Sequence, residues 1–296
     1  MSRANHRVAI AVLMPPMLLL SGCLFTTHKL PVPRGPVVTQ TVTPSELVAR
    51  VDQRAAAIGS LVARVQIQAS VTKTQQGIAK DYTTFPGIIL MRKPELLRVY
   101  GQLPVIGTRM FDMVSDGANF TLFIPSRSMA YQGPAKLTKK SANTAENMRP
   151  GLFLDALVVR PLAPEDEYTV TADTTTVEDA SKKHLLLVPE YILGVMRRKP
   201  DSQELRPLRV IHFHRDDLLP YQQELYDDQG NLETEVTYGR YADYGENKFP
   251  STVTIKRPLE EYQVILTVEK VTENMKLTDD QFQLKLPDGT KIQTLQ

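Results

Sequence analysis

Most of the chain after residue 60 alternates apolar and polar residues, the pattern of strands with one buried face. In the clearest stretch, 61–71, Leu61, Ala63, Val65 and Ile67 are apolar and the residues between them are mostly polar. Because successive side chains of a strand point to opposite faces, this period of two predicts a half-buried strand. The same reasoning predicts strands at 83–91, 95–101, 106–115, 118–124, 167–174, 183–190, 206–215, 221–227, 231–240, 249–257, 260–270 and 281–286.

Short turns connect these strands. Asp116-Gly117 separates two of them as in a hairpin, and polar clusters at 227–231 and 243–247 occupy similar places further along. Parallel neighbours would need long crossover connections, which these spacings do not provide. The pattern therefore predicts a mainly β (α+β) fold. We expect a large curved antiparallel sheet, or open half-barrel, with two or three helices on its concave side.

Two segments have a helical period instead. Residues 44–58 place apolar side chains every three to four positions, behind the capping sequence Thr-Pro-x-Glu that begins at Thr43. This predicts a helix with one apolar stripe. A second patch at 143–158 is interrupted by Pro150-Gly151, which predicts a kinked or broken helix.

The first residues have the pattern of a cleaved signal peptide. Arg3 and Arg7 precede an uncharged apolar run over residues 8–20, and Leu-Ser-Gly-Cys23 follows at once. The run is shorter than the roughly 20 residues that a transmembrane helix needs. The tetrapeptide Leu20-Ser21-Gly22-Cys23 resembles the lipobox of bacterial lipoprotein precursors. That resemblance implies a diacylglycerol and an N-acyl group on Cys23; the alternative is an unmodified thiol.

This reading divides the chain into three parts: a signal peptide at 1–22, the lipidated Cys23 with an extended proline-containing tether to residue 43, and a single domain at 44–296. Leu24 rather than Asp follows the cysteine. By the enterobacterial sorting pattern this favours the periplasmic face of the outer membrane, with the inner membrane as the alternative. The membrane is thus the first expected partner, through the lipid anchor.

The composition argues against nucleic acid as a partner and against a disulfide within the domain. Removing residues 1–22 takes away two of the 35 basic residues and no acidic one, which leaves 33 against 33. Such a balance gives no attraction to nucleic acid, which we exclude as a partner. Cys23 is the only cysteine, so the domain has no internal disulfide.

The sequence contains no motif of an enzyme. It has no Gly-x-Ser-x-Gly, no His-Glu-x-x-His and no glycine-rich phosphate loop. His212-x-His214, with Asp216 nearby, is the one group that resembles a metal site, but His184 is the only other histidine in the domain. We therefore expect a protein that is not an enzyme, with two solvent-facing histidines, no metal and no cofactor besides the covalent lipid.

The order of features along residues 88–125 resembles the LolA and LolB family of periplasmic lipoprotein carriers and outer-membrane receptors. A strand runs into Arg92-Lys93-Pro94, a proline-containing loop follows at 101–107, and later strands enclose Asp116-Gly117 and end at Pro125. The C-terminal part adds Phe249-Pro250, Pro258, Asn274 and Phe282-x-Leu-x-x-Pro287-x-Gly289. The resemblance covers most of 44–290, and this chain has extra sequence around 130–205.

The resemblance implies an open half-barrel that shelters the acyl chains of lipoproteins or other lipids. The lipobox implies the anchored receptor, with a periplasmic carrier protein as a partner. Arg98 is a candidate for bonding to a lid over the cavity, as an arginine does in the soluble carrier; the alternative is a solvated strand arginine. The expected cavity lining, whose alternative is a filled core, is Val65, Ile67, Phe120, Leu122, Met148, Leu152 and Phe153.

The loop at 101–107 is unusually apolar. Leu103, Val105 and Ile106 lie between two glycines, whereas loops are normally polar. An apolar loop tip indicates contact with a membrane or a lipid, and the receptor family has a protruding apolar loop in about this place. We expect these residues to contact the bilayer or the cargo; the alternative is that the loop folds back onto the sheet.

The favoured function is therefore lipid or lipoprotein binding at the outer membrane, in lipoprotein sorting or lipid handling. A structural or scaffold lipoprotein of an envelope assembly is the alternative, and a sensor of lipoprotein load would use the same cavity.

Overall fold

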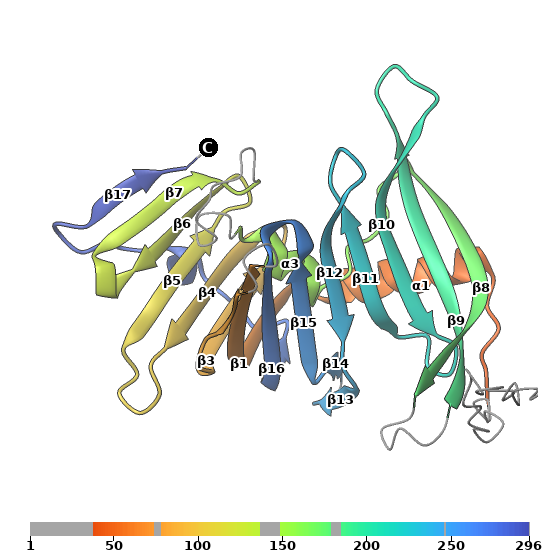
Figure 1. Ribbon diagram of the computed structural model, residues 1–296, viewed down its shortest axis with the longest axis horizontal. Coiled ribbons are helices and arrows are strands. Elements are labelled where there is room, and N and C mark those ends of the chain that lie inside the picture. The colour runs from red at the N-terminus through yellow and green to blue at the C-terminus, as the bar shows by residue number, and fades with distance from the viewer. Residues whose placement is uncertain (1–37, 74–77, 137–148, 179–184, 246, 296) are drawn as a thin grey trace, which may run out of the picture.

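One long open sheet dominates the structure, a computed structural model that describes residues 38–73, 78–136, 149–178, 185–245 and 247–295 (Figure 1). Within these ranges two α-helices accompany the sheet, α1 (Pro44–Ala57) and α3 (Gly151–Leu157). None of the helices in the described ranges is long and apolar enough to span a membrane. The predicted mainly β fold is confirmed.

The sheet has fifteen strands, and a separate two-stranded hairpin consists of β13 (Tyr241–Tyr244) and β14 (Asn247–Pro250). Most strands lie within a few residues of their predicted positions. The strands of the large sheet are β1 (Ser60–Lys73), β2 (Ile78–Asp81), β3 (Phe85–Arg92), β4 (Leu96–Gln102), β5 (Arg109–Ser115), β6 (Asn119–Ile124), β7 (Met129–Pro134), β8 (Asp166–Glu178), β9 (Leu185–Arg198), β10 (Leu205–His214), β11 (Pro220–Tyr226), β12 (Leu232–Tyr238), β15 (Thr252–Arg257), β16 (Tyr262–Glu273) and β17 (Lys291–Thr294).

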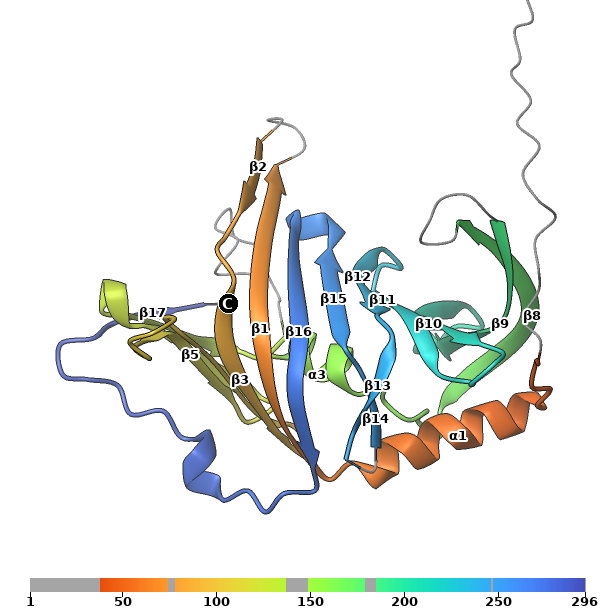
Figure 2. The same ribbon diagram turned by 90° about the horizontal axis from the view of Figure 1, so that it is seen from below.

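Across the sheet the order is β17-β7-β6-β5-β4-β3-β1-β16-β15-β12-β11-β10-β9-β8, with β2 beside β1. Neighbouring strands are antiparallel except β17, which runs parallel to β7. The first and last long strands, β1 and β16, pair in the middle of the sheet. Figure 2 shows that the sheet is bent and open, with α3 lying between its two halves.

One face of the sheet is apolar across both halves. Paired residues of antiparallel strands share a face, so the register can be followed from strand to strand. It leads from Ala69 through Val264, Ile255, Val236, Gln223 and Ile211 to Leu193. Two buried clusters therefore lie side by side on one face, the first around α3 and the second around α1.

The helix α1 forms because its N-terminus is capped and one of its faces is apolar. Thr43 accepts a hydrogen bond from the Glu46 backbone N–H at 3.3 Å, and the Glu46 carboxylate accepts one from the Thr43 N–H at 2.7 Å. This is the predicted capping box. Leu47 and Val51 are buried against β9 and β10. The helix therefore covers the end of the sheet nearest β8.

The helix α3 begins directly after Pro150, where the sequence predicted a break. Residues 143–148 of the predicted helical patch lie outside the described residues. Leu152, Phe153 and Leu157 pack into the first apolar cluster. Both α-helices thus lie on the same face of the sheet, as expected.

The C-terminal segment differs from the prediction. The expected strand at 281–286 is wrong: Asp279–Phe282 is a short 3₁₀-helix whose capping box joins Thr278 and Gln281. Leu277 and Phe282 pack against Leu90 in a third cluster. Figure 2 shows this segment crossing outside the sheet, on the side of β3–β5 away from α3, before it reaches β17. The alternation pattern does not predict β2, β7, β13 and β17, each of which has only four to six residues.

An arginine–aspartate pair fastens this C-terminal segment to the outer face. Arg98 donates two hydrogen bonds to the Asp112 carboxylate, at 2.9 and 2.7 Å, and a third to the Gln281 carbonyl at 3.0 Å. Arg109 also forms a salt bridge with Asp112, which is buried. These hydrogen bonds raise the pKa of the Arg98 guanidinium against the opposing effect of burial. Arg98 lies on the face opposite α3, so it holds a segment across the outer face rather than a lid over the inner one.

Every residue of the three apolar clusters lies between Val42 and Leu295. A protein that begins after the lipobox therefore keeps all the described core contacts.

Replacing Arg98 should destabilise the fold. Arg98→Met leaves the buried Asp112 short of one charge partner and releases Gln281, and losing one member of a buried pair costs about 3–5 kcal/mol. We expect a drop of about 3 kcal/mol in the free energy of unfolding, measured by urea denaturation. The control Lys199→Met breaks an exposed pair with Glu204 and should cost less than about 1 kcal/mol. Equal effects of the two substitutions would contradict this role of Arg98.

Candidate functional site

The apolar loop between β4 and β5 projects into solvent. The Leu103 N–H donates to the Thr108 carbonyl at 2.7 Å, and the Gly107 N–H donates to the Leu103 carbonyl at 3.1 Å, so the loop is closed by its own backbone. Val105 is fully exposed, Ile106 is 69% exposed and Leu103 is 38% exposed. The loop therefore does not fold back onto the sheet. Its contact with a bilayer or a cargo lipid stays a prediction.

Val105 has an unusual backbone conformation. Its φ is +73°, in the left-handed region that a β-branched residue seldom occupies. Such a conformation costs on the order of 1–3 kcal/mol and persists only where the surrounding chain imposes it. The closed loop imposes it here, and the result is a valine side chain with no apolar cover.

The residues predicted to line a cavity are packed in the first apolar cluster. Met148, like Cys23, lies outside the described residues. None of the predicted lining residues that the structure describes lines either of the two pockets described below. The role of these residues as a lipid lining stays a prediction. The six residues of the prediction that the structure describes are all buried: Val65, Ile67, Phe120, Leu122, Leu152 and Phe153.

A pocket of about 400 Å³ lies beside α1, which we call the α1 pocket. This volume is in the range of small-molecule sites. Its walls come from α1, the segment after α3, the β10–β11 turn, β12 and the β13–β14 hairpin. The apolar residues that line it are Val51, Ala55, Ala57, Ile58, Leu157, Val158, Val159, Phe213, Leu218, Leu219, Pro220, Phe249 and Pro250.

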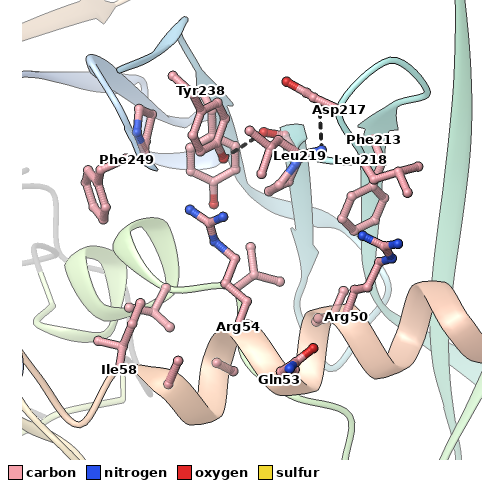
Figure 3. A pocket seen from close by; sticks show the side chains of 18 of the residues that line it. Arg50, Gln53, Arg54, Ile58, Phe213, Asp217, Leu218, Leu219, Tyr238 and Phe249 are labelled. Atoms are coloured by element: carbon pink, nitrogen blue, oxygen red, sulfur yellow. Dashed lines mark hydrogen bonds between the residues drawn. The ribbon is translucent and has the colours of Figure 1, made fainter. Parts of the chain in front are cut away.

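Polar groups lie among these apolar walls (Figure 3). Arg54 points from α1 toward Tyr238; its guanidinium lies 5.5 Å from the centre of the Tyr241 ring and donates to the Lys248 carbonyl at 2.7 Å. The Tyr241 hydroxyl donates to the Pro220 carbonyl at 2.9 Å. Asp217 accepts a hydrogen bond from a backbone N–H of its own turn, and burial raises the pKa of its carboxyl. The pocket is therefore amphipathic.

Tyr238 is the most buried polar residue of the α1 pocket. It is 7% exposed, and its hydroxyl has no hydrogen-bond partner among the described residues. Burial raises the pKa of this hydroxyl far above its usual value, so it stays protonated and able to donate. A buried group without a partner carries the full cost of its lost hydration. A bound molecule or a water could supply the missing acceptor.

A second pocket, of about 330 Å³, lies on the other side of segment 158–163. Arg160, Arg197 and Arg209 line it together with Asp155 and Asp166. These charges are largely matched: Arg197 donates to Asp166, and Arg160 forms a salt bridge with Asp155. Arg209 donates to two backbone carbonyls of the segment, at 2.7 and 2.8 Å. Its main effect is thus to hold the segment that separates the two pockets.

The two histidines lie half-buried on the face of β10 opposite the buried Ile211 and Phe213, so they are less exposed to solvent than expected. His212 Nδ1 lies 2.9 Å from the Glu190 carboxylate, which also accepts hydrogen bonds from Thr175 and Tyr221. The His214 ring stacks on the Tyr221 ring with 4.2 Å between centroids. Neighbouring strands cover both rings, which alternation within one strand cannot reveal. In the described part of the chain no group of three or more His, Cys, Asp or Glu residues is placed to hold a metal.

No local sequence pattern predicts the α1 pocket. Its residues come from five separate segments, and each segment alone has only an ordinary strand or turn pattern. One local signal was present: Arg50 and Arg54 are spaced by four on α1, beside the apolar stripe that contains Val51 and Ala55. A cationic pair beside a buried stripe is a feature of amphipathic sites.

The Glu190 network predicts an acid-sensitive contribution to stability. Burial raises the pKa of Glu190, but hydrogen bonds from Thr175, Tyr221 and His212 outweigh it and hold the pKa below its usual value. A depressed carboxyl pKa gives stability that is present above the unfolded value, about 4.3, and is lost as the pH falls through the folded value.

Glu190→Gln should therefore lower the free energy of unfolding at pH 7 and flatten its decline below about pH 4.3. Urea denaturation over this pH range measures both effects. The control is Glu167→Gln, because Glu167 is half-exposed and forms a salt bridge with Arg198. The stability of this variant should have the same pH profile as that of the wild type. An identical acid profile in Glu190→Gln and the wild type would show that the network contributes nothing.

Comparison with known proteins identifies the fold. No protein-family model matches this chain, and no curated protein matches it. A DUF1329 family protein from Desulfovibrio piger matches with a TM-score of 0.51 and 15% identity, over 80% of this chain and 95% of its own. A LolA superfamily protein from Nitrosomonas europaea matches with a TM-score of 0.51 and 14% identity, over 82% of this chain and 99% of its own. The resemblance to LolA seen in the sequence is confirmed at the level of the fold.

Proposed function

We propose that this chain is a lipid- or lipoprotein-binding protein that Cys23 anchors to the periplasmic face of the outer membrane, where it acts in lipoprotein sorting or lipid handling. The observation that carries the proposal is the α1 pocket, an apolar pocket on the helix-covered face of a LolA-like sheet. A covered apolar pocket is what the transport of an acyl chain through water requires. The proposed role needs binding and release but no catalysis.

The energy of exposing an acyl chain sets the requirement. At about 0.8 kcal/mol per methylene, a chain of about sixteen carbons costs roughly 13 kcal/mol to expose to water. Apolar walls must offset most of that cost. The α1 pocket offers walls of aliphatic and aromatic side chains such as Val51, Leu218 and Phe249, next to the apolar cluster around α1.

The start of the described chain supports a tethered arrangement. The Gln40 N–H donates to the Arg215 carbonyl at 2.6 Å, and the Arg215 Nε donates back to the Gln40 carbonyl at 3.2 Å. The tether therefore joins the domain beside the turn that contributes Asp217 and Leu218 to the pocket. Figure 1 shows the chain segment that leads into α1 and the loop between β4 and β5 at the same lower side of the sheet. A lipid on Cys23 and the apolar loop can thus meet one membrane.

A scaffold role is the second candidate, and one observation favours it. The six described residues expected to line a cavity under α3 are packed among other buried side chains instead. A filled inner face would suit a rigid platform within an envelope assembly. The same exposed loop, with Val105 and Ile106 at its tip, would then contact a protein.

Native mass spectrometry with lipid extraction separates the two candidates. Residues 24–296, secreted to the periplasm and purified without detergent, should carry stoichiometric bound acyl chains. This segment contains the complete described core, so it is a fair test. A mass free of lipid, both as purified and after incubation with lipoprotein, would favour the scaffold.

The apolar loop gives a second test. Changing Leu103 and Ile106 to Glu should abolish lipid transfer between the protein and vesicles, because a charged loop tip cannot enter a bilayer surface. The melting temperature should stay unchanged, since both side chains are exposed. The control Leu259→Glu changes a similarly exposed leucine in the turn before β16 and should leave transfer intact. Wild-type transfer by the double variant would rule out a role for the loop.

A further inference from the structure

Two arginines on α1 line the α1 pocket. Arg50 and Arg54 lie one turn apart, and both point from the helix into the pocket in Figure 3. Neither forms a salt bridge with a carboxylate of the described residues. Elsewhere in the sheet, buried arginines such as Arg98 and Arg257 are paired with Asp112 and Glu260. Glu46 interacts electrostatically with Arg50, and Glu273 with Arg54, but neither glutamate lines the pocket. The lining itself therefore has two cationic side chains against the one carboxylate of Asp217.

The one carboxylate that lines the pocket does not balance this charge. Asp217 is exposed and accepts the Leu219 N–H at 2.8 Å, and it forms no salt bridge with either arginine among the described residues. Arg54 uses one of its five N–H donors on the Lys248 carbonyl. The remaining donors of Arg54 and those of Arg50 lie beside apolar walls, where a hydrogen bond to an anion is strong.

The Tyr238 hydroxyl is an independent sign of a bound polar group. It is buried, lines the same pocket and has no hydrogen-bond partner among the described residues. Buried hydroxyl groups are normally satisfied. An acceptor oxygen of a ligand that also contacts Arg54 would satisfy it.

We propose that the α1 pocket selects lipids with an anionic head group, a carboxylate or a phosphate. Arg54 and Arg50 bind the anion, the Tyr238 hydroxyl donates to an oxygen next to it, and the acyl chain lies against the walls formed by Val51, Phe213 and Phe249. This inference rests on the proposed function, since it names the class of lipid that the same pocket takes.

The test compares lipids that differ only in head-group charge. Residues 24–296 are stripped of lipid and incubated with matched pairs, palmitate against palmityl alcohol and dipalmitoyl phosphatidic acid against dipalmitoylglycerol. Native mass spectrometry gives the amount of each lipid bound. The variants are Arg54→Gln, Arg50→Gln and their double, with Arg64→Gln as control because Arg64 is exposed on β1, far from the pocket lining.

The wild type and the Arg64→Gln control should bind the anionic member of at least one pair at least tenfold more tightly than the neutral member. Loss of a hydrogen bond to a charged group weakens binding by about tenfold to a hundredfold. We therefore expect Arg54→Gln to lose this preference while neutral lipid still binds. The pair that shows the larger preference identifies a carboxylate or a phosphate as the natural head group. A preference unchanged in the double variant, or absent in the wild type, overturns the inference; no binding of any of the four lipids overturns the proposed function itself.

Tyr238→Phe tests the remaining contact. Removing an unpartnered buried hydroxyl should leave the melting temperature of the lipid-free protein unchanged or higher, and should weaken binding of the anionic lipid. A lower melting temperature with wild-type lipid binding would show that the hydroxyl serves the fold alone.

Discussion

The pairing of β1 with β16 is the constraint on which the rest of the structure depends. These strands are about two hundred residues apart in sequence, and their register runs from Leu61 opposite Glu273 to Val71 opposite Tyr262. The pair joins the β17–β3 half of the sheet to the β15–β8 half and carries one apolar face across both. Without it, each half would expose an unpaired strand and an uncovered face. The sheet is therefore continuous, and α1 and α3 cover one continuous surface.

Polar side chains interrupt that surface at the boundary between its two clusters. Gln223, almost fully buried, donates to the Asp155 carbonyl of α3 at 2.9 Å, and Arg209 holds the segment after α3 through two carbonyls. These contacts fix the path of the chain between the helices. The same path forms one wall of the α1 pocket. The position of the pocket is thus a consequence of how the sheet and the connection between the helices are tied together.

On our proposal, function depends on two surfaces outside the packed core, the loop between β4 and β5 and the α1 pocket. The loop tip at Val105 and Ile106 has apolar side chains without cover. The α1 pocket has two arginines in its lining and the Tyr238 hydroxyl, which has no hydrogen-bond partner among the described residues. A lipid complements both kinds of surface, since its chains are apolar and its head group is polar. On the same proposal, the tether at Gln40 brings the membrane anchor to the end of the sheet that holds the α1 pocket.

The sequence by itself determined the local features: the strands with a period of two, the capped helix at 44–57, the break before α3 and the exposed apolar loop. Each depends on residues within a few positions of one another, so a local pattern is enough. Only the tertiary structure decided the strand order, the outer-face contact of Arg98, the partial burial of His212 and His214, and the α1 pocket. These depend on side chains from distant segments, such as Arg54 and Tyr238, whose meeting is set by strand pairing and packing rather than by any pattern within one segment.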